Sequence, residues 1–169
     1  IELMIRTIAE TDERYSLHLM LLDGSPEYIA ELQTLAHRLA PGSVVFNEPI
    51  KPGELVARIS EFDIGIHLLP TVNFNDEFAL PNKFFDFVAA GLAVCIGPSP
   101  EMARLTRQFG FGVVSESFDP DEVAQILNGL SAEDIDDMKQ KSIEARRTLN
   151  ADVEMGKLTD LYAELTHQT

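Results

Sequence analysis

Apolar residues recur along the chain in two patterns, a helical spacing and short continuous runs. The helical spacing is clear at the beginning, where Leu3, Ile5 and Ile8 share one face of the segment 1–10 before a polar turn. Short apolar runs predict strands at 15–24, 43–50, 63–70, 92–97 and 111–117. The pattern also predicts a polar loop at 71–80 and further helices at 25–42, 51–62, 81–91, 99–110, 119–130, 131–149 and 150–169.

Several of the predicted helices carry recognisable start signals. Ser25 stands at an N-cap position, with Pro26 at the first helical position after it. The segment 99–110 repeats this Ser-Pro-Glu start. The residues from Ser131 to Asp134 have the spacing of a capping box, with Asp in place of the usual Glu. These signals support the predicted helix boundaries.

The order of the elements predicts the fold class. Strands alternate with helices from Tyr15 to Ser117, and the strands are continuous apolar runs, as expected when helices cover both faces of a parallel sheet. The sequence therefore predicts an α/β fold, a Rossmann-like parallel sheet between helical layers with a helical C-terminal tail. At 169 residues, with no internal repeat or linker, we expect a single domain over 1–169.

Composition narrows the classes of partner. The formal net charge of −15 opposes binding to nucleic acid or to an anionic membrane surface. No apolar run approaches the roughly 18 residues that a membrane span needs, and the first residues lack the order of a signal peptide. The single cysteine, Cys95, lies in an apolar run and is interpreted as a buried hydrophobe in a reducing compartment. We therefore predict a cytoplasmic protein.

Two charges, Lys83 and Asp86, interrupt the apolar and small residues of the segment 79–100. Pro81 is expected in the first turn of the helix, which places Lys83 in that turn and Asp86 one turn later on the same face. A cation at a helix N-terminus opposes the macrodipole and costs about 0.3–1 kcal/mol, whereas a bound phosphate would reverse the sign. The alternative is an ion pair between the two side chains, which leaves the position of the cation unexplained.

The segment LPNKFFDFVAAGLAVCIGPSPEM, residues 80–102, resembles the donor-binding segment of the retaining GT-B glycosyltransferases of the glycosyltransferase 4 group. In that family a Pro-x-Lys-x-x-acid start leads into an Ala-Ala-Gly turn and a Val-rich strand. The segments 19–39, 44–70 and 118–130 are similar to other parts of the C-terminal lobe of the same fold. The resemblance implies transfer of a hexosyl group from a nucleotide-sugar, such as a UDP- or GDP-sugar, in polysaccharide or glycoconjugate synthesis, without a further cofactor.

The resemblance also implies roles for the two charged residues and their neighbours. The acid at Asp86 would hold the ribose hydroxyls, because a carboxylate accepts two hydrogen bonds. Lys83 would face the diphosphate or the sugar, helped by helix N–H groups, and Asn82 belongs to the same donor-binding segment. The family usually has a second acid earlier in this segment, for which Glu77, Asp76 and Asn75 are all candidates by position. Glu77 is taken with Lys83 as the catalytic pair.

The nucleobase would lie, by the same resemblance, against two connections that follow predicted strands. These are the turn at Asp23 and Gly24 and the loop at Pro49 and Ile50. The contacts there would come mainly from backbone groups and apolar packing.

Three further residues stand near predicted strand ends. His67 is close enough to the carboxyl end of its strand to reach a donor, although a satisfied structural histidine is the alternative. Backbone groups of Gly97 and Ser99 are candidates for phosphate contacts at a helix N-terminus, with helix capping as the alternative. The other histidines, at positions 18, 37 and 167, show no metal-like spacing with Cys95 or the carboxylates, so no metal is assigned.

The chain also departs from the family. Members carry a strand with a glycine-rich turn and an Arg/Lys pair before the helix that corresponds to 1–10, and an N-terminal lobe that binds the acceptor glycan, lipid or protein. None of this is present, and the chain begins with a helix and without an initiator methionine. We expect a fragment, most of one lobe, that is inactive alone.

Two rival functions remain open. A nucleotide-sugar 2-epimerase shares the two-lobe fold but needs acid/base carboxylates and a histidine in the cleft, so the spacing of His67 and Glu77 would test it. A non-catalytic α/β interaction module, such as a response-regulator-like domain, is the rival from another class. Hydrolase, ATPase and dinucleotide motifs are absent from the sequence.

Overall fold

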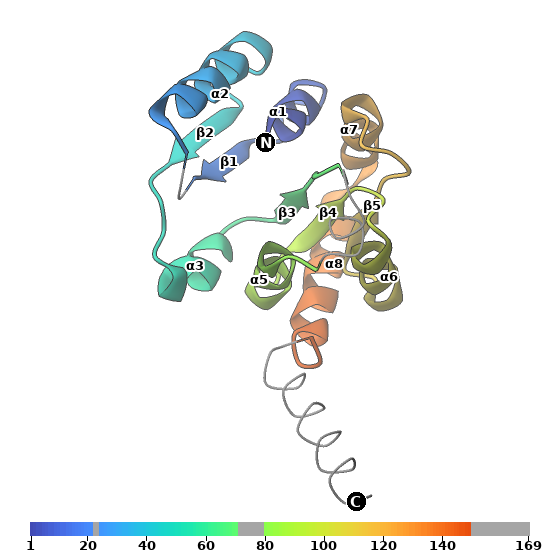
Figure 1. Ribbon diagram of the computed structural model, residues 1–169. Helices are drawn as coiled ribbons and strands as arrows, with labels where there is room; N and C mark the ends of the chain where they lie inside the picture. The colour runs from blue at the N-terminus through green and yellow to red at the C-terminus, as the bar shows by residue number, and fades with distance from the viewer. Residues whose placement is uncertain (22–23, 71–79, 150–169) are drawn as a thin grey trace, which may run out of the picture.

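The computed structural model describes residues 1–21, 24–70 and 80–149, and within them strands and helices alternate as predicted (Figure 1). The strands are β1 (Leu17–Met20), β2 (Val44–Asn47), β3 (Ile64–His67), β4 (Ala93–Ile96) and β5 (Gly112–Val114). The helices are α1 (Glu2–Ala9), α2 (Pro26–Leu39), α3 (Pro52–Ile59), α5 (Asn82–Ala90), α6 (Pro100–Phe109), α7 (Pro120–Gly129) and α8 (Ala132–Ala145). The helix predicted at 150–169 and nearly all of the loop predicted at 71–80 lie outside the described residues.

All strand pairs in this part of the chain are parallel, and the predicted Rossmann-like α/β class is confirmed. The hydrogen bonding, however, is divided between two sheets rather than one. The first sheet has the order β1-β2 and the second the order β3-β4-β5. Leu17 lies opposite Val44 in the first sheet, and Ile64 lies opposite Ala93 in the second. The interruption falls between β1 and β3 (Figure 1).

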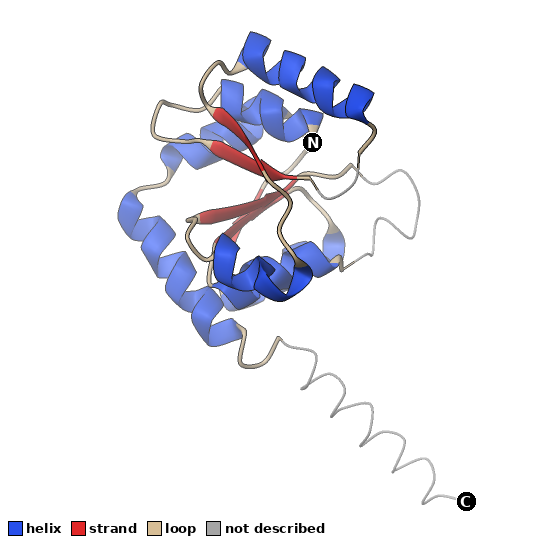
Figure 2. Cartoon of the chain, turned by 90° about the vertical axis from the view of Figure 1, so that its left-hand side faces the viewer, coloured by secondary structure: helices blue, strands red, loops and turns tan. Residues whose placement is uncertain are grey.

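Helices cover both faces of the strands, as Figure 2 shows. Helices α1, α2 and α7 lie on one side of the strands and α3, α5, α6 and α8 on the other (Figure 1). Alternate side chains of β4 pack against the helices on the two sides of the sheet. Val94 and Ile96 join the cluster beneath α5, α6 and α8, whereas Cys95 joins the cluster beneath α1 and α7. This double cover explains why β4 is a continuous apolar run with every residue buried.

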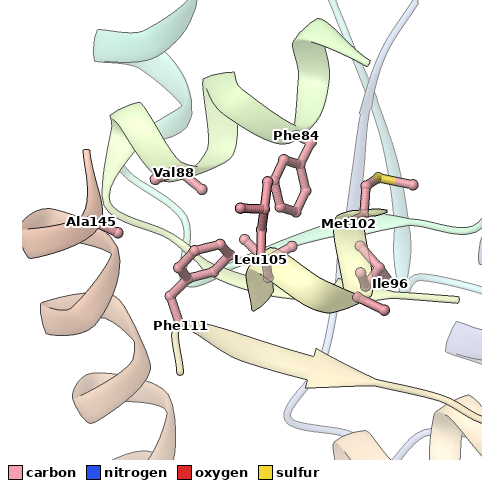
Figure 3. Packing of buried hydrophobic residues seen from close by; sticks show 9 residues of the cluster. Phe84, Val88, Ile96, Met102, Leu105, Phe111 and Ala145 are labelled. Carbon is pink, nitrogen blue, oxygen red and sulfur yellow. The ribbon is translucent and has the colours of Figure 1, made fainter. Parts of the chain in front are cut away.

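The cluster with the most buried residues packs α5 and α6 onto β4 (Figure 3). Phe84 and Val88, which lie one turn apart on α5, are fully buried there. Phe111 is also fully buried, and its ring centroid lies 5.8 Å from that of Phe84. Apolar packing also bridges the interruption in the sheet, because Ile66 of β3 packs against the cluster that contains Leu17 and Leu19.

Polar contacts fasten the loop between α1 and β1 to the end of α7. The Arg14 guanidinium donates hydrogen bonds to the carbonyls of Asn128 and Leu130, each at 2.7 Å. The Tyr15 hydroxyl donates to the carbonyl of Leu127. The Asn128 side chain accepts a hydrogen bond from the Asp12 N–H at 2.9 Å. The loop before β1 and the end of α7 are therefore joined by hydrogen bonds between side chains and backbone groups.

The helix start signals are mostly confirmed. The Ser25 hydroxyl accepts a hydrogen bond from the Tyr28 N–H, and Pro26 is the first residue of α2. Ser131 and Asp134 form the predicted capping box at the start of α8. Ser99 occupies the N-cap position of α6, but its side chain makes no capping hydrogen bond.

Gly65 allows α5 to lie directly on the backbone of β3. A Cβ atom added at Gly65 would come within 2.3 Å of the Phe87 ring, far inside van der Waals contact. The absence of a side chain at this strand position therefore sets the distance between β3 and α5.

No helix within the described residues is both long enough and apolar enough to cross a membrane.

We expect Gly65→Ala to lower the free energy of unfolding by about 1–3 kcal/mol, the range for overpacking a core, because the new methyl group collides with Phe87. Urea denaturation measures the change. Gly53→Ala is the matched control, since a Cβ atom at Gly53 meets nothing within 4 Å. Equal stabilities of the two variants would contradict the close contact, and combination with Phe87→Ala should reduce the effect.

Cys95 is expected to resist alkylation in the folded chain. Burial raises the pKa of the Cys95 thiol to about 12, so almost no reactive thiolate exists at pH 8. Iodoacetamide labelling followed by mass spectrometry should be slow in buffer and fast in denaturing urea. Rapid labelling without denaturant would show that Cys95 is accessible.

Candidate functional site

A ligand is expected where the helices that follow neighbouring strands lie on opposite sides of the sheet. The helices that follow β1 and β3 along the chain, α2 and α5, lie on opposite sides of the strands (Figure 1). Open α/β sheets bind ligands outside the carboxyl ends of their strands where this change occurs. In this chain the change falls between β1 and β3, so the end of β3 and the start of α5 are the first region to consider.

Lys83 stands at the N-terminus of α5. Pro81, expected in the first turn, is instead the N-cap residue, and the helix begins at Asn82. Asn82 and Lys83 are both exposed. Among the described residues no ion pair joins Lys83 to Asp86, so the structure does not support the ion-pair alternative. The lysine therefore remains a cation where a helix N-terminus favours anions.

Asp86 lies one turn further along α5 and is half-buried. Burial raises the pKa of its carboxyl, because the charged form loses solvation and no partner that lowers the pKa is found within the described residues. The half-buried position of Asp86 thus disfavours the charged form of its carboxyl group. Such positions are more frequent at binding and catalytic sites than elsewhere.

His67 is the last residue of β3, as the sequence indicated, and only 9% of it is exposed. The pKa of its imidazole is lowered first by burial and then by the positive charge of Lys83. Phe87 of α5 packs on Gly65 of β3, so the start of α5 lies at the edge of the sheet where β3 ends. The charge of Lys83 at this helix start is positive, which suits an anionic ligand.

Gly97 and Ser99 follow β4, whose last residue, Ile96, is paired with His67. Both are buried, and a Cβ atom at Gly97 would lie 2.0 Å from the Phe118 ring. The Ser99 N–H donates a hydrogen bond to the Gly97 carbonyl at 2.8 Å. The Ser99 amide is thus already used within the connection, and the prediction that it binds phosphate gains no support from this geometry.

Pro49 and Ile50 line a cavity of about 620 Å³ beside the carboxyl ends of β1 and β2. Met20 and Asn47, the last residues of those strands, line it as well, together with Phe62. Its charged lining residues are of both signs: Glu48, Lys51, Glu54, Arg58 and Glu61. Lys83, Asp86 and His67 do not line this cavity, so the predicted residues fall into two separate groups.

The sequence did not identify Met20, Asn47 and Phe62 as part of the site. Met20 and Asn47 carried one available signal, because each ends a strand on the side where parallel sheets bind ligands. Phe62 carried none, since it follows α3 and reaches the cavity only through tertiary packing.

Several predicted residues cannot be placed. Asp23 and Glu77 lie outside the described residues, and so does the spacing of His67 and Glu77 that would test an epimerase. Gly24 is described and exposed, but it does not line the cavity near Ile50. Within the described ranges, no group of three or more His, Cys, Asp or Glu residues is placed to hold a metal ion.

Comparison with known proteins supports the fold. No protein-family model matches the chain. A search of curated proteins finds no match. Among solved structures, the chain is similar to WaaG, described as a glycosyltransferase involved in lipopolysaccharide biosynthesis, with a TM-score of 0.69 and 15% sequence identity. The similarity covers 88% of this chain but only 39% of WaaG. The chain thus shares the fold of part of a GT-B glycosyltransferase and spans about two fifths of that protein.

We expect Asp86→Asn to raise the melting temperature at pH 7. Because the pKa of Asp86 is raised in the folded chain, its ionisation weakens folding once the pH exceeds the pKa of the unfolded chain. The difference between variant and parent should vanish below about pH 3, where the carboxyl is protonated in both states. Thermal unfolding of the variant and the parent at pH 7 and at about pH 3 measures this difference in melting temperature.

Asp136→Asn, at an exposed position of α8, is the control. A melting-temperature gain for Asp86→Asn that is the same at both pH values would contradict the electrostatic cause.

Proposed function

We propose that this chain is the donor-binding part of a glycosyltransferase that transfers a hexosyl group from a nucleotide-sugar in polysaccharide or glycoconjugate synthesis. The observation that carries the proposal is the position of Lys83 in the first turn of α5, the helix that follows β3, with half-buried Asp86 one turn further along the same helix. The fold similarity to WaaG supports the choice of enzyme class. The same similarity supports neither a particular sugar nor a particular base, and the proposal leaves both open.

The diphosphate of the donor is assigned to the N-terminus of α5. The first N–H groups of a helix have no partner within the helix, and the macrodipole adds a partial positive charge at the same end. The Lys83 ammonium adds a full charge. Together they provide local attraction for an anion on a chain whose net charge is −15, since more distant charges are screened over about 10 Å at ordinary ionic strength.

Asp86 is assigned to the ribose. Its carboxylate can accept hydrogen bonds from two neighbouring hydroxyl groups, which would provide polar partners that it lacks among the residues the structure describes. Binding of the ribose would therefore lower the free energy of a carboxylate that burial disfavours in the ligand-free chain.

The cavity beside Pro49 and Ile50 is assigned to the nucleobase. Met20 and Phe62 provide apolar surface, and the ends of β1 and β2 bring backbone groups to its edge. Small-molecule sites commonly combine such apolar walls with a few polar groups that fix orientation.

The proposal includes a retaining mechanism and a position as the C-terminal lobe of a two-lobe enzyme. Chemistry would take place between the lobes, where Lys83 and the α5 dipole stabilise the negative charge that develops on the leaving diphosphate. Glu77 is retained as a catalytic candidate. Catalysis would require the acceptor lobe, so the chain alone is expected to bind donor without transferring it.

The division of the strands into two sheets supports the proposal that a first strand is missing. β1 and β3 each have one edge without a ladder partner within the described residues. A parallel strand between them, followed by α1 and β1, would make a βαβ unit on the layer that α2 already occupies. Such a strand would join the two sheets into one.

Calorimetric titration with UDP, GDP and ADP, each with and without Mg²⁺, tests the proposed function. Saturable binding of one nucleotide without metal is the expected result and would identify the base. No binding at millimolar concentration, repeated on a chain extended N-terminally by the proposed strand, would contradict it.

We expect Lys83→Ala and Asp86→Ala each to weaken nucleoside diphosphate binding by about 1–3 kcal/mol, the range for loss of a charged hydrogen-bond partner. Lys141→Ala and Asp136→Ala, both on α8, are the matched controls and should bind like the parent chain. Equal affinity of all variants would remove Lys83 and Asp86 from the site.

A further inference from the structure

Asn47 is a half-buried polar side chain in the wall of the cavity beside Ile50. The charged residues that line the same cavity are all exposed: Glu48, Lys51, Glu54, Arg58 and Glu61. The Arg58 guanidinium already donates to the Glu61 carboxylate at 3.0 Å. A polar group that is partly shielded from water makes stronger hydrogen bonds than an exposed group does. Asn47 is therefore the side chain best placed to recognise a ligand in this cavity.

The strand register brings Asn47 and His18 to the same face of the first sheet. Leu17 and Leu19 of β1 pack into the cluster beneath α1 and α2. Because side chains alternate along a strand, His18 and Met20 point to the opposite face. Met20 lies opposite Asn47 in the parallel ladder, and both line the cavity. His18 is therefore a diagonal neighbour of Asn47 on the cavity side.

The amide of Asn47 is held by partners from the protein. Its Nδ2 atom lies 3.3 Å from Nδ1 of His18 and 3.5 Å from the carbonyl oxygen of Val45. A carbonyl oxygen can only accept, so the amide nitrogen and not the amide oxygen faces Val45. Both N–H bonds are then directed to the protein, and no hydrogen bond to Oδ1 is found within the described residues. Oδ1 is thus the atom that remains for a ligand.

His18 contacts both the amide and an aromatic wall of the cavity. Because its Nδ1 accepts from Asn47, the ring proton is on Nε2, which lies 3.3 Å from the Ser16 hydroxyl. The centroid of the imidazole lies 4.8 Å from that of the Phe62 ring, which lines the cavity. One ring therefore positions a polar group and an apolar surface of the same cavity.

We propose that Asn47 selects nucleobases that carry a ring N–H on their base-pairing edge, uracil and guanine, by accepting that hydrogen bond at Oδ1. His18 is the positioning residue that keeps the amide in this orientation. The identification of the ligand as a nucleotide rests on the proposed function, which assigns this cavity to the base and leaves the base open.

The same orientation disfavours adenine and cytosine. An amide side chain commonly recognises adenine with both of its polar atoms, accepting from the amino group and donating to a ring nitrogen. The donor of Asn47 is directed to His18 and Val45, so this pairing loses one of its two hydrogen bonds. Cytosine also has an amino group beside a ring acceptor and meets the same loss. Uracil and guanine need only an acceptor opposite N3–H and N1–H.

The first experiment tests the orientation of the amide on the unmodified chain. ¹⁵N NMR of the histidine rings in alkaline buffer, where each imidazole carries one proton, distinguishes a protonated from a bare ring nitrogen. We expect His18 to carry its proton on Nε2 and to have a bare Nδ1. A proton on Nδ1 would overturn the positioning role of His18.

The second experiment compares ligands of equal ring size by calorimetry, UDP with CDP and GDP with ADP. In each pair that binds, we expect the base with the ring N–H to bind at least about fivefold more tightly, the effect of leaving a partly buried acceptor unpaired. Equal affinities within the pairs, or tighter binding of CDP or ADP, would overturn the selection by Asn47.

Variants separate the roles of the two residues. Asn47→Ala should bring the affinity ratio within each pair close to one, because the selecting acceptor is gone. His18→Leu should also lower the ratio, because it releases Nδ2 and with it the orientation of the amide. His18→Asn should restore the ratio, since its side-chain oxygen can take the place of Nδ1. Retention of the full ratio in Asn47→Ala or in His18→Leu would overturn the role of that residue.

Gln33→Ala is the matched control, because Gln33 is exposed on α2 and does not line the cavity. It should keep the ratio of the parent chain. Circular dichroism establishes that the variants are folded, and a ratio of two affinities cancels a general loss of binding.

Titration with the free nucleosides, followed by NMR at millimolar concentration, separates this proposal from the proposed function. Binding of a nucleoside diphosphate with the same ratio in the parent and in Asn47→Ala would overturn the role of Asn47 and leave the donor-binding function standing. Binding of uridine or guanosine in preference to cytidine and adenosine, lost in Asn47→Ala and without binding of any diphosphate, would support recognition by Asn47 and contradict the donor-binding function. Failure of nucleosides and diphosphates alike would overturn both.

Discussion

The contact between the Phe87 ring and the bare backbone of β3 at Gly65 sets the geometry on which the candidate site depends. Because Gly65 has no side chain, α5 lies on the strand at a distance that any larger residue would prevent. Phe84 and Val88 then bury the same helix against β4 and α6. With both contacts made, the first turn of α5, which carries Lys83, lies at the edge of the sheet where β3 ends in His67. The packing of the apolar core thus fixes the position of Lys83, although the lysine side chain is not part of that core.

Local and global electrostatics have opposite signs in this protein. The chain carries a net charge of −15, but the charged side chain that lowers the pKa of His67, that of Lys83, is positive. Many carboxylates are used in helix starts instead, where Asp119 and Asp134 accept hydrogen bonds from backbone N–H groups or a capping hydroxyl. Such acids stabilise their own helices. An acidic chain can therefore still carry a local positive charge at the start of one helix.

The sequence predicted every described helix and strand, because periodicity and end signals such as Ser25 and the Ser131–Asp134 pair are local properties. It also placed His67 at a strand end and Lys83 in a first turn. It did not predict the split between β1 and β3, because strand pairing depends on contacts between distant segments. The lining of the cavity by Phe62 escaped prediction for the same reason. Ser99 shows a further limit, since a correct N-cap position did not bring the capping hydrogen bond.

The interruption between β1 and β3 has a mechanical consequence. No ladder hydrogen bonds join the two sheets within the described residues, so a small sliding of one sheet past the other breaks no backbone pairing in either. Packed side chains such as Ile66, and the hydrogen bonds of Arg14 and Tyr15, resist this motion but can adjust by changes of rotamer. Shear motions of this kind involve small displacements on the microsecond to millisecond scale. The strand proposed between β1 and β3 would pair with both edges and remove this freedom, so it would also fix the spacing between the cavity at Ile50 and the ammonium of Lys83.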